Sequence, residues 1–214
     1  SFSETNRLWK VKTNTGIFEA GTVIIALPAH ISARLLSSQF PALAEKLNSI
    51  EHASSATVNI AFRRDQIEHA LDGFGFVVPF VEKRTVMACT FSSVKFANRA
   101  PENFVLLRAF VGGALQPEMF ALTDKEMIAG VLHDLRELLG LEGEPLFSHI
   151  ARWADSMPQY TIGHLKRVAE IKDSIARIPS LELATTAIDG VGIPDAIRHG
   201  EQAADNLLKF WHSD

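Results

Sequence analysis

The feature that most constrains the fold is a continuous apolar run at residues 22–27, which ends at Pro28. Such a run is typical of a strand buried on both faces, as in the parallel sheets of α/β domains. A second short run of this kind lies at residues 181–184, near the other end of the chain. We therefore expect the pieces around 23–27 and 181–187 to be strands of one shared domain. The middle of the chain would then be an insertion in a domain whose other half lies outside this chain.

The rest of the chain carries both the two-residue alternation of strands and the longer period of helices. The predicted strands are residues 7–12, 17–20, 53–63, 73–79, 85–91, 104–111 and 147–153. The predicted helices are residues 29–37, 41–50, 65–71, 123–139, 164–178 and 194–211. Pairing the strands at 73–79, 85–91 and 104–111 in sequence order gives an antiparallel meander. The pattern predicts an α+β fold, with an antiparallel or mixed sheet and packed helices between α/β-like end pieces.

The clearest helix is the one at residues 123–139. Thr123 and Glu126 have the spacing of a capping box, in which each side chain bonds to the other residue's backbone N–H. Apolar residues then recur at helical spacing along one side. Gly140 stands where the helix should end, because glycine adopts the left-handed conformation at little cost.

Composition excludes several classes of function. The 214 residues are 47% hydrophobic, with a net charge of −4 and no run of Lys or Arg, which argues against nucleic-acid binding. A single cysteine, Cys89, allows no internal disulfide and is expected to be a small buried residue. The histidines form neither an HExxH motif nor a pair four residues apart, so no metal site is expected. Residues 1–12 do not have the pattern of a secretory signal peptide.

Near the C-terminus a predicted strand leads into a glycine turn and then into a helix. Gly190 and Gly192 allow a ligand to approach the backbone closely, and Pro194 suits the first turn of the helix. The helix N-terminus offers N–H groups and partial positive charge, which Asp195 also complements. This arrangement suits an electron-rich group such as the N1–C2=O edge of a reduced flavin. An ordinary strand–turn–helix corner has the same signature, and the pattern is not GxGxxG.

Six stretches, in order along the chain, resemble the oxygen-dependent protoporphyrinogen/coproporphyrinogen oxidase family of the flavin amine oxidase superfamily. They are FEAGTVIIALPA at 18–29, GFGFVVP at 73–79, FSSVKFANRAP at 91–101, LLRAFVGG at 106–113, MPQYTIGH at 157–164 and ATTAIDGVGIPDAIRHG at 184–200. Together they span nearly the whole chain.

The resemblance implies a domain organisation and a reaction. Residues 1–28 would be returning strands of an incomplete α/β FAD-binding domain, 29–152 part of the substrate domain, and 153–214 the return to the FAD domain with its last helix. The family oxidises a porphyrinogen to a porphyrin by removing six electrons, and molecular oxygen becomes hydrogen peroxide. The GxGxxG turn and a membrane-associating domain of the family lie outside this chain. The resemblance also implies a cytoplasmic protein, peripheral to the inner membrane through that other part.

The resemblance also implies individual contacts. Val191, Gly192 and Ile193 would touch the flavin end of FAD through their backbone, and Trp153 would be a further FAD contact. Val77 and Phe96 would lie against the porphyrinogen rings, since an aromatic face can stack on a pyrrole. No acid–base catalyst is assigned. One departure is the pair Thr185-Thr186, where the family has Gly-Asn or Gly-Asp.

Alternatives remain at this stage. The chain can belong to another enzyme of the superfamily, such as a desaturase or an amine oxidase, or to a non-catalytic module derived from the substrate domain. From the residues alone, Trp153 and Val77 are typical core residues, and Phe96 can be a loop anchor. Arg63, Arg64 and Arg108 can meet substrate propionates or be ordinary surface charges.

Overall fold

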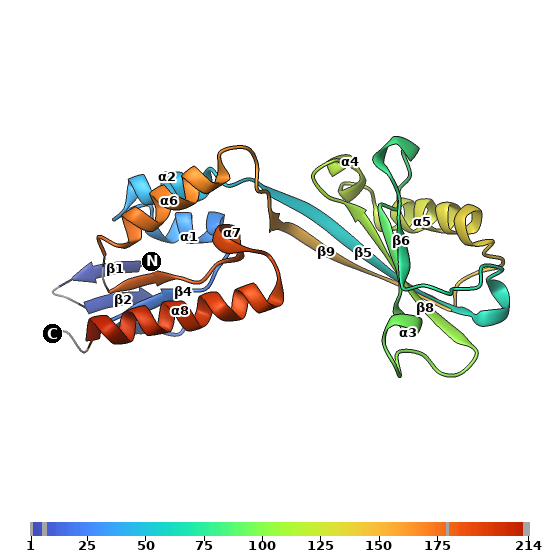
Figure 1. Ribbon diagram of the computed structural model, residues 1–214, viewed down its shortest axis with the longest axis horizontal. Helices are drawn as coiled ribbons and strands as arrows, with labels where there is room; N and C mark the ends of the chain where they lie inside the picture. The colour runs from blue at the N-terminus through green and yellow to red at the C-terminus, as the bar shows by residue number, and fades with distance from the viewer. Residues whose placement is uncertain (1, 6–7, 179, 212–214) are drawn as a thin grey trace. The chain divides into compact units, whose positions relative to one another are not determined.

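The computed structural model describes residues 2–5, 8–178 and 180–211, so Arg7 at the start of the predicted strand 7–12 lies outside it. The chain divides into two compact units, Ser1–His52 with Pro158–Asp214, and Ala53–Met157. In Figure 1 the first unit is blue and orange to red, and the second is cyan to yellow. Among the described residues, no helix combines the length and the apolar character needed to cross a bilayer.

The first unit joins both ends of the chain through a parallel strand pair. Strand β4 (Val23–Ile25) pairs with β10 (Leu181–Leu183), and Val23 lies opposite Leu181. This confirms the expectation that the two apolar runs share one sheet. Strands β1 (Phe2–Thr5), β2 (Leu8–Lys12) and β3 (Ile17–Ala20) form a separate antiparallel sheet. The helices of this unit are α1 (Ala29–Leu36), α2 (Pro41–Asn48), α6 (His164–Ile175), α7 (Thr186–Asp189) and α8 (Ile193–Trp211).

The two compact units change at residues 52 and 158, and the assignment of 1–28 and 153–214 to an FAD-binding domain stays a prediction. Helices α1 and α2 pack in the first unit, because Leu36 and Leu47 share a buried core with Trp9 and Ile171. The Trp9 Nε1–H also donates to the Ser180 hydroxyl at 3.0 Å, beside β10. Burial of these large side chains, more than chain order, decides which unit the helices join.

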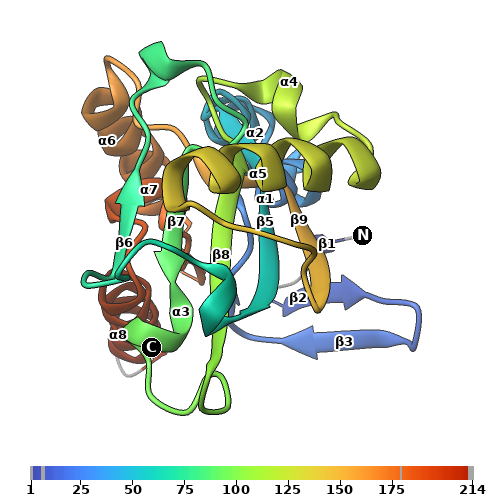
Figure 2. The ribbon, with the colours of Figure 1, turned by 90° about the vertical axis from the view of Figure 1, so that its right-hand side faces the viewer.

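The second unit is a five-stranded sheet with a long helix on one face. Its strand order is β6-β7-β8-β5-β9, and β6, β7 and β8 form the predicted antiparallel meander. Figure 2 shows α5 lying across β7, β8 and β5. The strands are β5 (His52–Arg63), β6 (Gly75–Val77), β7 (Ala88–Phe91), β8 (Phe104–Gly112) and β9 (Phe147–Pro158). The helices are α3 (Ser92–Lys95), α4 (Pro117–Phe120) and α5 (Asp124–Leu139), with short 3₁₀ turns η1 (Arg64–Gln66) and η2 (Phe80–Glu82).

The core of the second unit lies between α5 and the sheet. Val58 and Ile60 from β5 and Leu107 from β8 are fully buried there, together with Val131 and Leu135 of α5. Because side chains alternate along a strand, the residues between them point to the opposite face.

Cys89 is buried on β7, as predicted. It is only 2% exposed, and burial raises the pKa of its thiol to about 12. The thiol therefore stays protonated at neutral pH and behaves as a small apolar residue.

The predicted helix at residues 65–71 is wrong. Only the 3₁₀ turn η1 forms, and the chain then runs extended so that Ile67 bridges Leu141. Ile67 is buried against the core of the second unit. Tertiary burial of this side chain therefore overrides the weak helical pattern.

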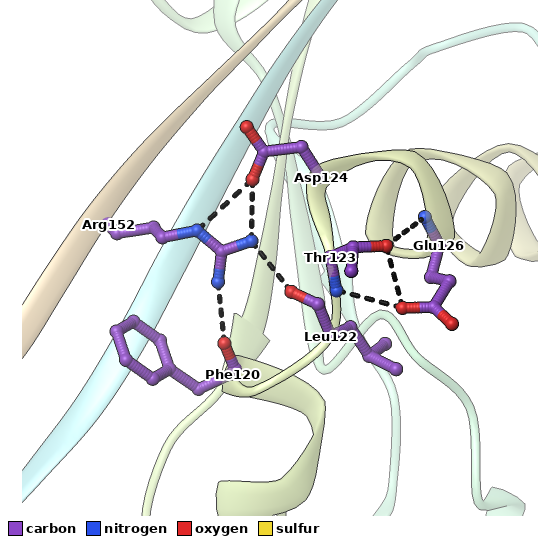
Figure 3. Close-up of polar contacts among 6 residues, drawn as sticks. All are labelled: Phe120, Leu122, Thr123, Asp124, Glu126 and Arg152. Atoms are coloured by element: carbon purple, nitrogen blue, oxygen red, sulfur yellow. Dashed lines mark hydrogen bonds and ion pairs between the residues drawn. The ribbon is translucent and has the colours of Figure 1, made fainter.

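The predicted capping of α5 is confirmed. Thr123 Oγ1 accepts from the Glu126 N–H at 3.3 Å, and the Thr123 N–H donates to Glu126 Oε2 at 2.9 Å (Figure 3). Gly140 ends the helix with φ of +57°. Figure 3 also shows Arg152 of β9 donating to the carbonyls of Phe120 and Leu122 just before the helix. These bonds hold the edge strand against the start of α5.

Thr123→Ala should lower the free energy of unfolding by about 1 kcal/mol, because the first turn of α5 loses its side-chain acceptor. Urea unfolding measures the change. Thr123→Ser keeps the hydroxyl and should remain within a few tenths of a kcal/mol of the wild type. Equal losses in the two variants would contradict a capping role.

Candidate functional site

The glycine turn predicted from the sequence forms between α7 and α8. Gly190 has φ of +124°, a conformation that residues with a Cβ rarely adopt. The first bond of α8 runs from the Ala196 N–H to the Gly192 carbonyl at 2.9 Å. Val191 and Ile193 are 59% and 79% exposed on either side of Gly192. The turn thus presents backbone and two apolar side chains at the positive end of a 19-residue helix.

Asp195 is one reason why positions 190 and 192 require glycine. A Cβ placed on Gly190 would lie 2.5 Å from Asp195 Oδ2, and one on Gly192 would lie 3.1 Å from the same atom. Asp195 Oδ1 also accepts from Arg198 on the next turn of the helix. The two glycines therefore make room for a carboxylate of the first helical turn.

The hydroxyl of Tyr160 holds this turn from the other side. It donates to the Thr186 carbonyl at 2.5 Å and accepts from the Gly190 N–H at 2.8 Å. The ring stacks on His164 at 3.9 Å between centroids, and His164 is buried. Tyr160 therefore links the chain entering α6 to both ends of α7. No role for Tyr160 follows from the sequence, in which the Met-Pro-Gln-Tyr stretch is the available signal.

A strand was expected around residues 181–187, but Thr185 and Thr186 do not continue it. Strand β10 ends at Leu183, and Thr186 begins the short helix α7. Thr185 is buried and its hydroxyl accepts from the Ala187 N–H at 3.3 Å. The strand stops because this cap satisfies the first turn of a helix instead.

A cavity of about 330 Å³ lies in the first unit beside this turn. Its walls come from α6, β10, α7 and α8, and include Thr185 and Asp189. Lys172 of its lining forms an ion pair with Asp189 at 2.5 Å. The positive charge of Lys172 is therefore neutralised by Asp189, which also lines the cavity.

The other predicted site residues, Val77, Phe96 and Trp153, belong to the second unit. Val77 lies on edge strand β6 and is 78% exposed, so it is not a core residue. Phe96 follows α3, and the cations of Lys95 and Arg99 lie 5.5 and 5.8 Å from its ring centre. The ring thus pairs with charged neighbours at the surface.

Trp153 lies on β9, at the other edge of the same sheet, and is 54% exposed. Its neighbour Arg152 reaches the start of α5, so alternation turns Trp153 to the face opposite α5. Val77 lies opposite Ala88, which in turn lies opposite Phe110, in one row of this face. Val77 and Trp153 thus share a sheet face but lie on opposite edge strands. The two groups of predicted contacts, 191–193 and these three, lie in different units.

Tyr160→Phe should lower the free energy of unfolding by about 1 kcal/mol, the usual net contribution of a hydrogen bond. The ring and its stacking on His164 stay in place, while the Gly190 N–H loses its acceptor. Amide hydrogen exchange at Gly190 should become faster, and mass spectrometry or NMR measures it. Tyr160→Leu removes the stacking as well and should cost more. An unchanged exchange rate at Gly190 in the Phe variant would show that the hydroxyl does not hold the turn.

The curated proteins that this chain resembles include several named porphyrinogen oxidases. Coproporphyrinogen III oxidase of Bacillus subtilis is 32% identical over 99% of this chain and 45% of its own length. The enzyme of the same name from Propionibacterium freudenreichii is 37% identical over 90% of this chain and 36% of its own length. Mitochondrial protoporphyrinogen oxidase of Nicotiana tabacum is 29% identical over 81% of this chain and 35% of its length. The chain therefore spans less than half the length of these relatives.

Solved structures show the same fold. A protein from Exiguobacterium sp. 255-15, described as a protoporphyrinogen oxidase, superposes with a TM-score of 0.82 at 29% identity, over 97% of this chain and 46% of its own. A putrescine oxidase variant superposes with a TM-score of 0.75 over 97% of this chain and 47% of its own, at 18% identity, which shows the fold alone. The family model described as flavin containing amine oxidoreductase matches residues 3–208. The chain therefore belongs to the family of flavin-containing amine oxidoreductases.

Proposed function

We propose that this chain is part of an FAD-dependent porphyrinogen oxidase of haem biosynthesis. The observation that carries the proposal is the alignment of 99% of the chain with a coproporphyrinogen III oxidase at 32% identity. A putrescine oxidase variant shares the fold at only 18% identity. The activity belongs to a complete protein of the relatives' length, in which this chain supplies under half.

In this proposal the turn at Val191, Gly192 and Ile193 meets the ring end of FAD. Three features support it: the exposed apolar side chains, the positive end of α8 and the hydrogen bonds of Tyr160 that hold the turn. A helix N-terminus stabilises negative charge near it. A bound flavin would supply the electron-accepting chemistry. The chain's own contribution is to orient and polarise the ring, and no residue here is assigned a proton-transfer role.

Trp153, Val77 and Phe96 complete the proposed contacts. Trp153 is proposed to touch FAD, while Val77 and Phe96 are proposed to lie against the tetrapyrrole rings. All three side chains are about half exposed or more, so each has a surface to offer a ligand. Large exposed apolar groups of this kind in one unit suit a flat, apolar ligand.

The complete protein should oxidise coproporphyrinogen or protoporphyrinogen and should not oxidise amines. Porphyrin fluorescence and oxygen consumption, followed together after anaerobic preparation of the porphyrinogen, measure the reaction. Putrescine serves as the competing substrate. Oxygen uptake with the amine and none above the spontaneous rate with either porphyrinogen would refute the proposal.

The 214-residue chain by itself should hold FAD weakly and should show no porphyrinogen turnover. The reason is that its proposed contacts reach only the ring end of FAD, while the resemblance assigns the phosphate-binding glycine turn to a part outside this chain. Visible flavin absorbance after purification, set against protein concentration, measures occupancy. The complete protein purified in the same way is the control. A one-to-one yellow complex of the isolated chain would contradict this expectation.

A further inference from the structure

Arg63, Arg64 and Arg108 were candidates for binding substrate carboxylates, and the structure gives each of them different hydrogen-bond partners. Arg63 forms a two-bond ion pair with Asp65, at 3.1 and 2.7 Å. Arg64 donates to three backbone carbonyls, those of Ile67, His69 and Ala70. Both guanidinium groups are thus used to hold the loop that follows β5.

Arg108 is different. It lies in the middle of β8 and is exposed, and its Nε donates to Asn59 Oδ1 on β5 at 3.0 Å. Within the part of the chain that the structure describes, its guanidinium pairs with no carboxylate. The guanidinium has five N–H donors, and the contact with Asn59 uses only one. The four remaining donors lie on the two Nη atoms, and one donor from each Nη can bind a carboxylate in a two-bond geometry.

The surroundings of Arg108 define the ligand that it would bind. Its row of the sheet face opposite α5 contains Gly75, Thr90 and Asn59, which carry no charge. The next row contains Phe110 and the exposed Val77, which are apolar. Arg108 is therefore a cation among neutral polar groups in its own row, with apolar groups in the next row. That combination suits a ligand that is apolar and flat in its body and anionic at its edge.

The spacing of the rows also fits such a ligand. Two residues along a strand span about 7 Å, which an arginine side chain and a two-methylene propionate can bridge together. Asn59 on the neighbouring strand accepts from the Nε–H, which leaves the two Nη groups to a ligand. The geometry assigns Arg108, oriented by Asn59, as the anchor for one propionate carboxylate of the tetrapyrrole whose rings lie over Val77 and Phe110. This assignment rests on the proposed function and adds a residue that distinguishes anionic from esterified tetrapyrroles.

Steady-state kinetics of the complete flavoprotein test the assignment. Arg108→Gln should raise KM for the porphyrinogen roughly tenfold or more, because a charge-assisted hydrogen bond is lost, while kcat and flavin content stay within about twofold. Arg108→Lys keeps the charge and should recover part of the loss, and Asn59→Ala should give an intermediate KM. Arg136→Gln is the matched control, since Arg136 is exposed, pairs with Glu144 and lies on α5.

A binding experiment provides a readout that does not depend on turnover. The complete protein is titrated with coproporphyrin III and with its tetramethyl ester, which has the same ring and no carboxylates. The wild type should favour the acid, and Arg108→Gln should lose that preference while its affinity for the ester is unchanged. A merely structural role would weaken both ligands equally and would overturn the assignment.

The outcomes separate the two proposals. Normal porphyrinogen turnover with an unchanged KM in Arg108→Gln would overturn the anchor and leave the proposed function standing. An absence of porphyrinogen turnover in the wild type would overturn the proposed function and the anchor with it. A raised KM and a lost preference for the acid would support both.

Discussion

The parallel pairing of β4 with β10 is the constraint on which the first unit depends. It joins segments from the two ends of the chain, Val23–Ile25 and Leu181–Leu183, and so closes a very long loop. Loop closure costs entropy that local contacts do not repay. Burial of Trp9 and Leu181 in one core, together with the Trp9–Ser180 hydrogen bond, offsets that cost. The pairing also fixes where α7, the glycine turn and α8 begin.

The second unit depends on a different constraint, the alternation of side chains across a sheet. One set of residues packs under α5 and forms the core. The other set, which includes the exposed Val77 and Arg108, points to the opposite face. A substitution that shifted the register of β8 by one residue would bury Arg108 and expose Leu107. The same pairing that stabilises the unit therefore decides which residues can bind.

The proposed reaction requires no reactive side chain from this chain. A flavin carries out the electron transfer, so the protein must position the ring and the substrate. Tyr160 and Asp195 meet the first need by shaping the turn at Gly190–Gly192 from both sides. Arg108 is proposed to position the substrate. Each acts by orientation, which explains why none of the familiar catalytic motifs stands out in the sequence.

The sequence by itself determined the elements whose signals are local. The apolar runs at 22–27 and 181–184, the capping box of Thr123 and the glycine turn before α8 are all where the pattern predicts them. Only the tertiary structure decided the rest, because it depends on contacts between distant residues. Ile67 is extended where a helix was predicted, since it bridges Leu141. The role of Tyr160 requires Thr186 and Gly190 to fold back onto it. Three arginines look alike in sequence, and only their partners distinguish them. Arg63 pairs with Asp65 and Arg64 with loop carbonyls, whereas Arg108 contacts the amide oxygen of Asn59.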